Sequence, residues 1–356
     1  MDPRRLRLIA LSLAAALLVA ACDLEALTTP SPGATSSPSP SPTPSLATVP
    51  FPLTVGLGYI PSVQFAPFYL AQERGYYRDL GLEVTFDHQT DQDLVPLVGQ
   101  GRNDIGVADG TSVITARSQG IPIRYAATIY ARFPSVVIAL STSGISAPAD
   151  LRGKRIGIPG PYGSSYIMLQ ALLASADLTL DDVTLVPFND FTQATALAQG
   201  RVDAATGFVN NEPLQLRQVV PVGTEVVVLR VDQITPLPGP GLIVGDATIA
   251  ADSEAVRRFV AATLRAMDEI AADPDVGLEA AIAVVPDLAS DRDHALAVLE
   301  ATVETWKSPY TLANGLGAID RAAWSASIDF MATLPDLVPN PVTVEDLVTL
   351  EFLPAD

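Results

Sequence analysis

Apolar positions in this chain come in short runs, and each run is followed by a segment in which they recur at helical spacing. The first run covers residues 53–57, then breaks and continues as a helical pattern that ends near Gly75. A second run at residues 82–86 leads into a helical segment at 91–99, and a third run follows at 105–108. Strands that alternate with helices predict an α/β fold, in which mostly parallel sheets are flanked by helices.

The same order of elements returns later in the chain. The turn GRND at residues 101–104 precedes one strand, and the turn GRVD at residues 200–203 precedes another. This internal repeat predicts two lobes of like architecture, each with its own sheet. We interpret both turns as helix ends, in which Gly takes the left-handed conformation and Asp accepts hydrogen bonds from turn amides.

Two turn-rich segments indicate where the chain passes between the lobes. Residues 141–149 follow a fully apolar strand, and residues 235–241 carry the sequence TPLPGPG. These segments place lobe two at residues 141–241 and lobe one at residues 51–140 together with the mainly helical residues 242–356. We expect the two crossings to form a hinge, with the ligand cleft between the lobes.

The N-terminal segment has the features of an export signal. Residues 1–21 combine a basic start with an apolar run that is too short to form a stable membrane span. The sequence VAAC that follows this run resembles a bacterial lipobox, so Cys22, the only cysteine, is the expected lipidation site. Residues 22–50 then comprise this lipidated cysteine and a Pro/Ser-rich tether, which should stay extended. We therefore expect a protein anchored by lipid to the extracytoplasmic face of the cell membrane.

Charge and composition exclude several classes of function. The formal net charge is -19, whereas binding to nucleic acid requires a basic face. The two histidines, His88 and His294, lie far apart, and the chain has no H-E-x-x-H motif, no G-x-S-x-G elbow and no phosphate-binding loop. We therefore expect no enzymatic activity, no metal site and no nucleic-acid partner.

Loops at the expected strand ends carry mostly rings, amides and hydroxyls. Open α/β sheets bind ligands at such loops, where flat rings can stack on a ligand and Asn amides can both donate and accept hydrogen bonds. Glu212, in the segment FVNNEP, would also face the cleft. Each of these residues could instead be an ordinary core, turn or capping residue. The predicted ligand-binding residues are Tyr59, Gln64, Phe65, Asp109, Thr111, Tyr130, Tyr162, Ser164, Ser165, Asn189, Phe208, Asn210 and Asn211.

One stretch also resembles a known family. The sequence GYIPSVQFAPFYLAQERGYYRDLGLEV, which begins at Gly58, resembles the opening of the periplasmic solute-binding proteins of ABC importers. The resemblance is to the branch of this family that includes binders of thiamine-type pyrimidines, sulfonates and nitrate. The sequence GYIPSVQFAPFYLA is most similar to the riboflavin-binding components of that branch. The resemblance covers nearly all of the chain after the tether.

This resemblance implies a two-lobed, type II-like periplasmic-binding-protein fold. It further implies a monomer that delivers riboflavin, as a transported ligand and not a cofactor, to an ABC-type permease in the membrane. A thiamine-precursor pyrimidine and a sulfonate-like anion stay open as other ligands. A ligand-sensing lipoprotein that acts through a receptor stays open as another class of function. The branch also contains synthases with a cysteine-rich motif, and this sequence does not have that motif.

Overall fold

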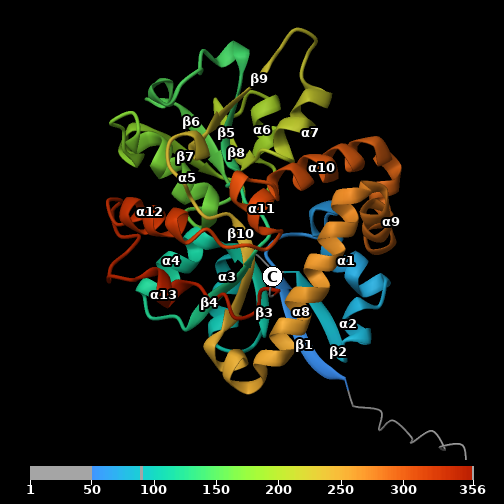
Figure 1. Cartoon of the computed structure of the whole chain (residues 1–356). Coiled ribbons are helices and arrows are strands. Elements are labelled where there is room, and N and C mark those ends of the chain that lie inside the picture. The colour runs from blue at the N-terminus through green and yellow to red at the C-terminus, as the bar shows by residue number, and fades with distance from the viewer. Residues whose placement is uncertain (1–49, 89–90, 355–356) are drawn as a thin grey trace, which may run out of the picture. The chain divides into compact units, whose positions relative to one another are not determined.

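A computed structural model describes residues 50–88 and 91–354 of the chain. The expected signal peptide, Cys22 and nearly all of the tether lie outside these residues. Two five-stranded sheets form the framework, and helices pack on both of them (Figure 1). Within the described residues, no helix is both long and apolar enough to cross a membrane.

The first sheet has the strand order β2-β1-β3-β10-β4. β1 pairs in parallel with β2 and β3, whereas β10 pairs antiparallel with β3 and β4, so that four strands run in one direction and β10 runs against them. The apolar alternation in β1 buries Leu53, Val55 and Leu57 on one face. The strands are β1 (Phe51–Leu57), β2 (Leu82–His88), β3 (Ile105–Asp109), β4 (Ile123–Thr128) and β10 (Pro240–Gly245).

The second sheet repeats this arrangement with the order β7-β6-β8-β5-β9. β6 pairs in parallel with β7 and β8, and β5 runs against the other four strands. The expected α/β class with two like lobes is therefore confirmed, although each sheet is mixed and not wholly parallel. The strands are β5 (Ser135–Leu140), β6 (Arg155–Ile158), β7 (Thr184–Pro187), β8 (Ala204–Phe208) and β9 (Val226–Arg230).

The reversed strand of each sheet arrives from the other sheet. β5 follows β4 in the chain and pairs with β8 and β9, and β10 follows β9 and pairs with β3 and β4. This corrects the expected lobe boundary, because residues 135–140 belong to the second sheet and the first crossing lies at residues 129–134, not at 141–149. A fully apolar strand fits the centre of either sheet, so its pattern alone does not assign it. The second crossing, at residues 231–239, overlaps the expected segment 235–241.

Helices cover each sheet and continue into a helical C-terminal part (Figure 1). Those of the first half are α1 (Ala66–Glu73), α2 (Tyr76–Asp79), α3 (Asp91–Gly99), α4 (Gly110–Ser118), α5 (Gly163–Ala174), α6 (Gln193–Ala198) and α7 (Glu212–Val219). The C-terminal part contains α8 (Asp246–Ala272), α9 (Pro274–Val284), α10 (Arg292–Thr305), α11 (Pro309–Asn314), α12 (Arg321–Met331) and α13 (Val344–Leu347). Short 3-10 turns lie at η1 (Val63–Phe65), η2 (Ser141–Ser143), η3 (Pro148–Leu151), η4 (Leu180–Asp182), η5 (Val231–Gln233) and η6 (Pro286–Asp291).

A stack of aromatic rings joins α8 to the first two helices. The rings of Phe259 and Tyr77 are nearly parallel, at 6°, with centroids 4.9 Å apart. The ring of Phe68, on α1, stacks on Phe259 with centroids 6.4 Å apart. All three side chains are buried, so the stack adds ring–ring attraction to the burial of apolar area. This cluster packs α8 against α1 and α2, the two helices that follow β1.

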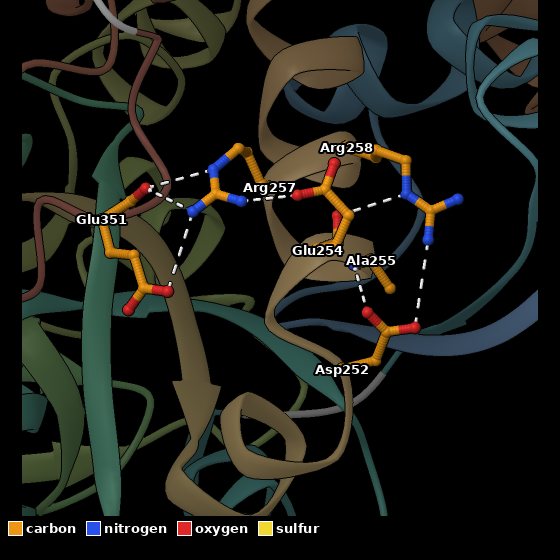
Figure 2. A network of polar contacts seen from close by, with 6 residues as sticks. All are labelled: Asp252, Glu254, Ala255, Arg257, Arg258 and Glu351. Atoms are coloured by element: carbon orange, nitrogen blue, oxygen red, sulfur yellow. Dashed lines mark hydrogen bonds and ion pairs between the residues drawn. The ribbon is translucent and has the colours of Figure 1, made fainter.

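The C-terminal tail is fastened to α8 by a polar network (Figure 2). α8 is kinked at Asp252, whose Oδ1 accepts the N–H of Ala255 at 2.9 Å and so caps the second part of the helix. Arg257 donates to the backbone oxygen of Glu351 and forms an ion pair with Glu254. Phe352, the next residue in the tail, is fully buried in the core of the first lobe. The tail therefore packs into the core of the lobe that contains β1.

The two repeated turns make the same contact in their lobes. Gly101 and Gly200 both have left-handed backbones, with φ of 68° and 70°, as expected. The two aspartates, however, reach past the turn to the first strand of their own sheet. Asp104 accepts the N–H of Thr54 at 2.7 Å, and Asp203 accepts the N–H of Arg155 at 2.8 Å. Each aspartate thus extends the parallel pairing between a first strand and its neighbour by one hydrogen bond.

We expect Asp104→Ala to lower the free energy of unfolding by about 1–3 kcal/mol, because the half-buried Thr54 amide loses its acceptor. Asp104→Asn retains an acceptor oxygen and should stay close to the wild type. Urea unfolding followed by circular dichroism measures both, with the exposed Asp181→Ala as a matched loss of one carboxylate. An Asp104→Ala variant that unfolds at the same urea concentration as Asp181→Ala would contradict the role of this contact.

Candidate ligand-binding site

A pocket lies where strands β1, β3, β6 and β8 end and hand over to loops and helices. Its empty space is about 900 Å³, a figure that includes the part open to solvent. Both sheets contribute to its walls, as expected for the ends of open α/β sheets. The lining residues are Gly58, Tyr59, Gln64, Phe65, Val107, Ala108, Asp109, Tyr130, Pro159, Tyr162, Gly163, Ser164, Ser165, Phe191, Gln193, Gly207, Phe208, Asn211, Glu212 and Pro240.

The turn after β1 forms the aromatic wall on the side of the first sheet. Ser62 caps η1 by accepting the N–H of Gln64, and this short turn places Gln64 and Phe65 on the pocket. Tyr59 precedes the turn, and burial raises the pKa of its hydroxyl, with the nearby charge of Glu212 adding to the effect. The hydroxyl therefore stays neutral and can donate a hydrogen bond.

His88, at the end of β2, braces this turn and does not line the pocket. Its Nδ1 lies 2.9 Å from the backbone oxygen of Tyr59, and its Nε2 lies 3.0 Å from the hydroxyl of Tyr69. The ring also meets that of Phe65 edge to face, with centroids 5.5 Å apart. Both ring nitrogens of His88 are thus engaged in positioning the aromatic wall.

The start of α5 forms part of the wall on the side of the second sheet. The first N–H groups of a helix have no partner within it, and here Gly163, Ser164 and Ser165 of that first turn all line the pocket. Ser135 donates to the Oγ of Ser164 at 3.0 Å, and both residues are buried. This wall therefore presents hydrogen-bond donors and hydroxyls to a ligand.

Phe191 is a pocket residue that the sequence did not predict. Its φ is 57°, a left-handed backbone conformation that is uncommon for a bulky side chain and is often found at functional sites. Next to it, Thr192 donates to Asp190 at 2.7 Å, and this local bond tightens the loop after β7. The Phe191 ring meets that of Tyr59 edge to face, with centroids 4.9 Å apart. Rings of the two sheets therefore touch across the pocket.

Asn210 connects the second sheet to elements of the first lobe. Its Nδ2 donates to Gln64 Oε1 at 3.1 Å and to Thr302 Oγ1 at 2.8 Å. Tyr130 donates to the same oxygen of Gln64 at 3.3 Å. Asn210 is 1% exposed and does not line the pocket, so this cluster joins the two walls and orients Gln64.

Most of the predicted ligand-binding residues line the pocket, but three do not. Asn189 is exposed on the loop after β7, where the sequence predicted a cleft-facing amide. Thr111 is fully buried in the first turn of α4, and Asn210 is held in the cluster described above. The residues brought together are Tyr59, Gln64, Phe65, Asp109, Tyr130, Tyr162, Ser164, Ser165, Phe208 and Asn211.

Glu212 places a buried carboxylate on the second wall. It is 7% exposed, and its Oε2 accepts the N–H of Phe208 at 2.7 Å. Burial raises the pKa of this carboxyl, and the hydrogen bonds from the backbone N–H groups of Phe208 and Glu212 and from the Asn211 side chain oppose the shift only in part. Gly207 leaves room for it, because a Cβ there would lie 2.9 Å from atoms of the Glu212 side chain.

Gln193 adds a second acceptor to the same wall. Its Nε2 donates to the backbone oxygen of Thr206 at 3.2 Å, and no hydrogen-bond partner reaches its buried Oε1. The residue is 2% exposed and lines the pocket at the start of α6. In the sequence, a glutamine at a helix start gives no signal that distinguishes it from a solvated residue.

The described residues hold no group of three or more His, Cys, Asp or Glu side chains that could bind a metal ion. Two like lobes, each with a mixed five-stranded sheet, and a pocket at the ends of their strands are the architecture of the periplasmic-binding-protein fold. A solved structure of this kind, the alkanesulfonate-binding protein SsuA from Xanthomonas axonopodis pv. citri bound to MOPS, has a TM-score of 0.65 to this chain. It is 18% identical, and the alignment covers 85% of this chain and 99% of that one.

The chain belongs to the NMT1/THI5-like family, whose model matches residues 62–276. It is 36% identical to the riboflavin-binding protein RibY of Chloroflexus aurantiacus, over 98% of each chain. It is also 28% identical to the 4-amino-5-hydroxymethyl-2-methylpyrimidine phosphate synthase of Aspergillus parasiticus, over 62% of this chain and 67% of that enzyme. The family resemblance expected from the sequence is therefore confirmed.

We expect Glu212→Gln to stabilise the protein at neutral pH and not at acidic pH. Because the folded state raises the pKa of Glu212 above 4.5, the neutral form contributes stability below this pH, and that stability is lost as the pH rises through the raised pKa. At pH 8 the variant should melt about 2–4 °C above the wild type, which corresponds to about 1 kcal/mol. Near pH 4.5 the two proteins should melt at nearly the same temperature. Glu300→Gln, which changes an exposed carboxylate, is the control. An equal difference at both pH values would contradict the effect of burial.

Proposed function

We propose that this protein is a lipid-anchored solute-binding protein that captures riboflavin outside the cytoplasm and delivers it, as a monomer, to an ABC-type permease. The observation that supports this most is the 36% identity to a riboflavin-binding protein along the whole chain. The role needs no bond-making chemistry, since the ligand is held and then released.

The pocket suits a flat aromatic ligand. Tyr59 and Phe65 stand on one wall, and Phe191 and Phe208 on the other. Each ring that stacks on a ligand adds about 0.5–1.5 kcal/mol beyond the burial of apolar area, so several rings together support tight binding. The hydroxyls and helix N–H groups at the start of α5 can receive ligand oxygens.

The charge of the pocket favours riboflavin over a sulfonate-like anion. Of the described residues that line it, Asp109 and Glu212 are acidic, and none is Lys, Arg or His. Burying an anion beside a carboxylate without a cationic partner is costly. The pyrimidine alternative is supported by relatives that match about two thirds of the chain at lower identity.

We expect riboflavin fluorescence to be quenched on binding, with saturation at one riboflavin per chain, because the isoalloxazine ring would stack on the aromatic walls. Tyr59→Ala should weaken binding about tenfold or more, since a wall ring and its contact with Phe191 are lost. Tyr310→Ala, which removes an exposed tyrosine of α11 that does not line the pocket, is the matched control.

Competition in the same titration separates the ligands. An alkanesulfonate should not displace riboflavin, and riboflavin 5′-phosphate should compete poorly because of its added negative charge. If riboflavin fluorescence is not quenched and calorimetry shows binding of the thiamine-precursor pyrimidine, that pyrimidine would replace riboflavin as the proposed ligand.

A variant at Cys22 tests the anchor and the import role together. Cys22→Ser should abolish labelling with radioactive fatty acid and leave the protein either in the soluble extracytoplasmic fraction or still carrying its signal. Riboflavin uptake by the cells should fall, because the protein is no longer held near the permease. Ser36→Ala in the tether is the control. Membrane retention of the processed Cys22→Ser protein would refute the anchor, and uptake unaffected by deletion of the whole protein would favour a sensing role through a receptor.

A further inference from the structure

Two residues of the second wall bring buried hydrogen-bond acceptors to the pocket, and neither has all of its acceptor positions filled by the protein. Glu212 carries a buried carboxylate, which has about four acceptor positions, and the N–H groups of Phe208 and of Glu212 itself and the Asn211 side chain engage three of them. Gln193 carries a buried Oε1 that no donor reaches. Both residues line the pocket, and both belong to helix starts that follow strands of the second sheet.

Buried acceptors with incomplete hydrogen bonding are costly to keep. An acceptor that is buried and unpaired loses its bonds to water, and a carboxylate loses more than an amide. No Lys, Arg or His of the described lining residues is present to compensate the charge. The hydrogen bonds to Glu212 and its place at the N-terminus of α7 compensate its charge in part, and a ligand with an N–H or O–H donor on the part that enters this wall would supply the rest.

From this arrangement we infer that Glu212 is the specificity-determining residue of the pocket and accepts the imide N–H of the flavin ring. The inference rests on the proposed function. The imide is the only N–H group on the oxidised isoalloxazine ring, and it lies at the polar end of an otherwise apolar, flat system. Two carbonyl groups flank it, and the first N–H groups of α5 lie on the same wall to receive such oxygens.

The ring therefore enters with its imide edge toward the second sheet, and its apolar part lies among the rings of both walls. Gln193 Oε1 is left to accept a further donor, such as a hydroxyl of the ribityl chain. A site built around a donor on the ligand rejects analogues that lack it, because its own acceptors are then left unpaired.

The test compares riboflavin with N3-methylriboflavin, in which a methyl group replaces the imide hydrogen. The wild-type protein should bind the methylated flavin at least tenfold more weakly. Glu212→Ala removes the acceptor and opens space for the methyl group, so it should bind riboflavin more weakly than the wild type does and should bind the two flavins about equally. Glu300→Gln removes one exposed carboxylate elsewhere and should keep the wild-type preference.

Each result bears on the inference in a distinct way. Equal binding of the two flavins by the wild type would overturn it, and this measurement does not depend on any variant that could misfold. A preference for riboflavin that persists in Glu212→Ala would also overturn it, because the methyl group would then clash with another residue. If the wild type binds no riboflavin, the proposed function fails and the inference fails with it, whereas riboflavin binding without the N3 preference leaves the proposed function standing.

Discussion

Each sheet of this protein is completed by a strand that comes from the other sheet, and the pocket depends on that exchange. The two crossings run side by side: the N–H groups of Ile129 and Tyr130 both donate to the backbone oxygen of Pro240, at 3.1 and 2.8 Å. A Cβ on Gly239 would lie 2.5 Å from the oxygen of Tyr130, and one on Gly241 would lie 2.1 Å from the ring of Tyr125. Only glycine allows the crossings to approach so closely, and Tyr130 and Pro240 thereby reach the pocket.

The exchange also explains why equivalent strand ends meet. β1 and β3 of the first sheet correspond to β6 and β8 of the second, and all four end at the pocket. In each lobe an aspartate after the left-handed glycine ties the first strand to its neighbour, through Asp104 on Thr54 and Asp203 on Arg155. Because these strands are well paired, the loops that follow them hold their side chains in fixed positions. Fewer side chains then lose conformational freedom when a ligand binds, and the entropic cost of binding is lower.

Much of the fold and part of the site could be predicted from the sequence. Periodicity identifies strands and helices, and the repeated Gly-Arg-x-Asp turns reveal the two lobes, because both signals are local. The assignment of β5 failed because a buried apolar strand has the same pattern in either sheet. Phe191 was missed because a left-handed phenylalanine has no sequence signal, and Asn189 on the same loop is exposed and does not line the pocket. Such outcomes are set by tertiary packing.

Asn210 and Glu212 are close in the chain, yet the structure gives them different tasks. Both N–H positions of the Asn210 amide are engaged, by Gln64 and Thr302, so this residue joins the walls and has no donor left for a ligand. Glu212 is anchored through one oxygen and still borders the pocket. Rings supply contact area that tolerates many flat ligands, whereas a buried carboxylate tolerates only a ligand that gives it a proton donor. If Glu212 accepts a donor of the ligand, as we propose, affinity and specificity are carried by different residues, and within FVNNEP the specificity belongs to Glu212 and not to Asn210.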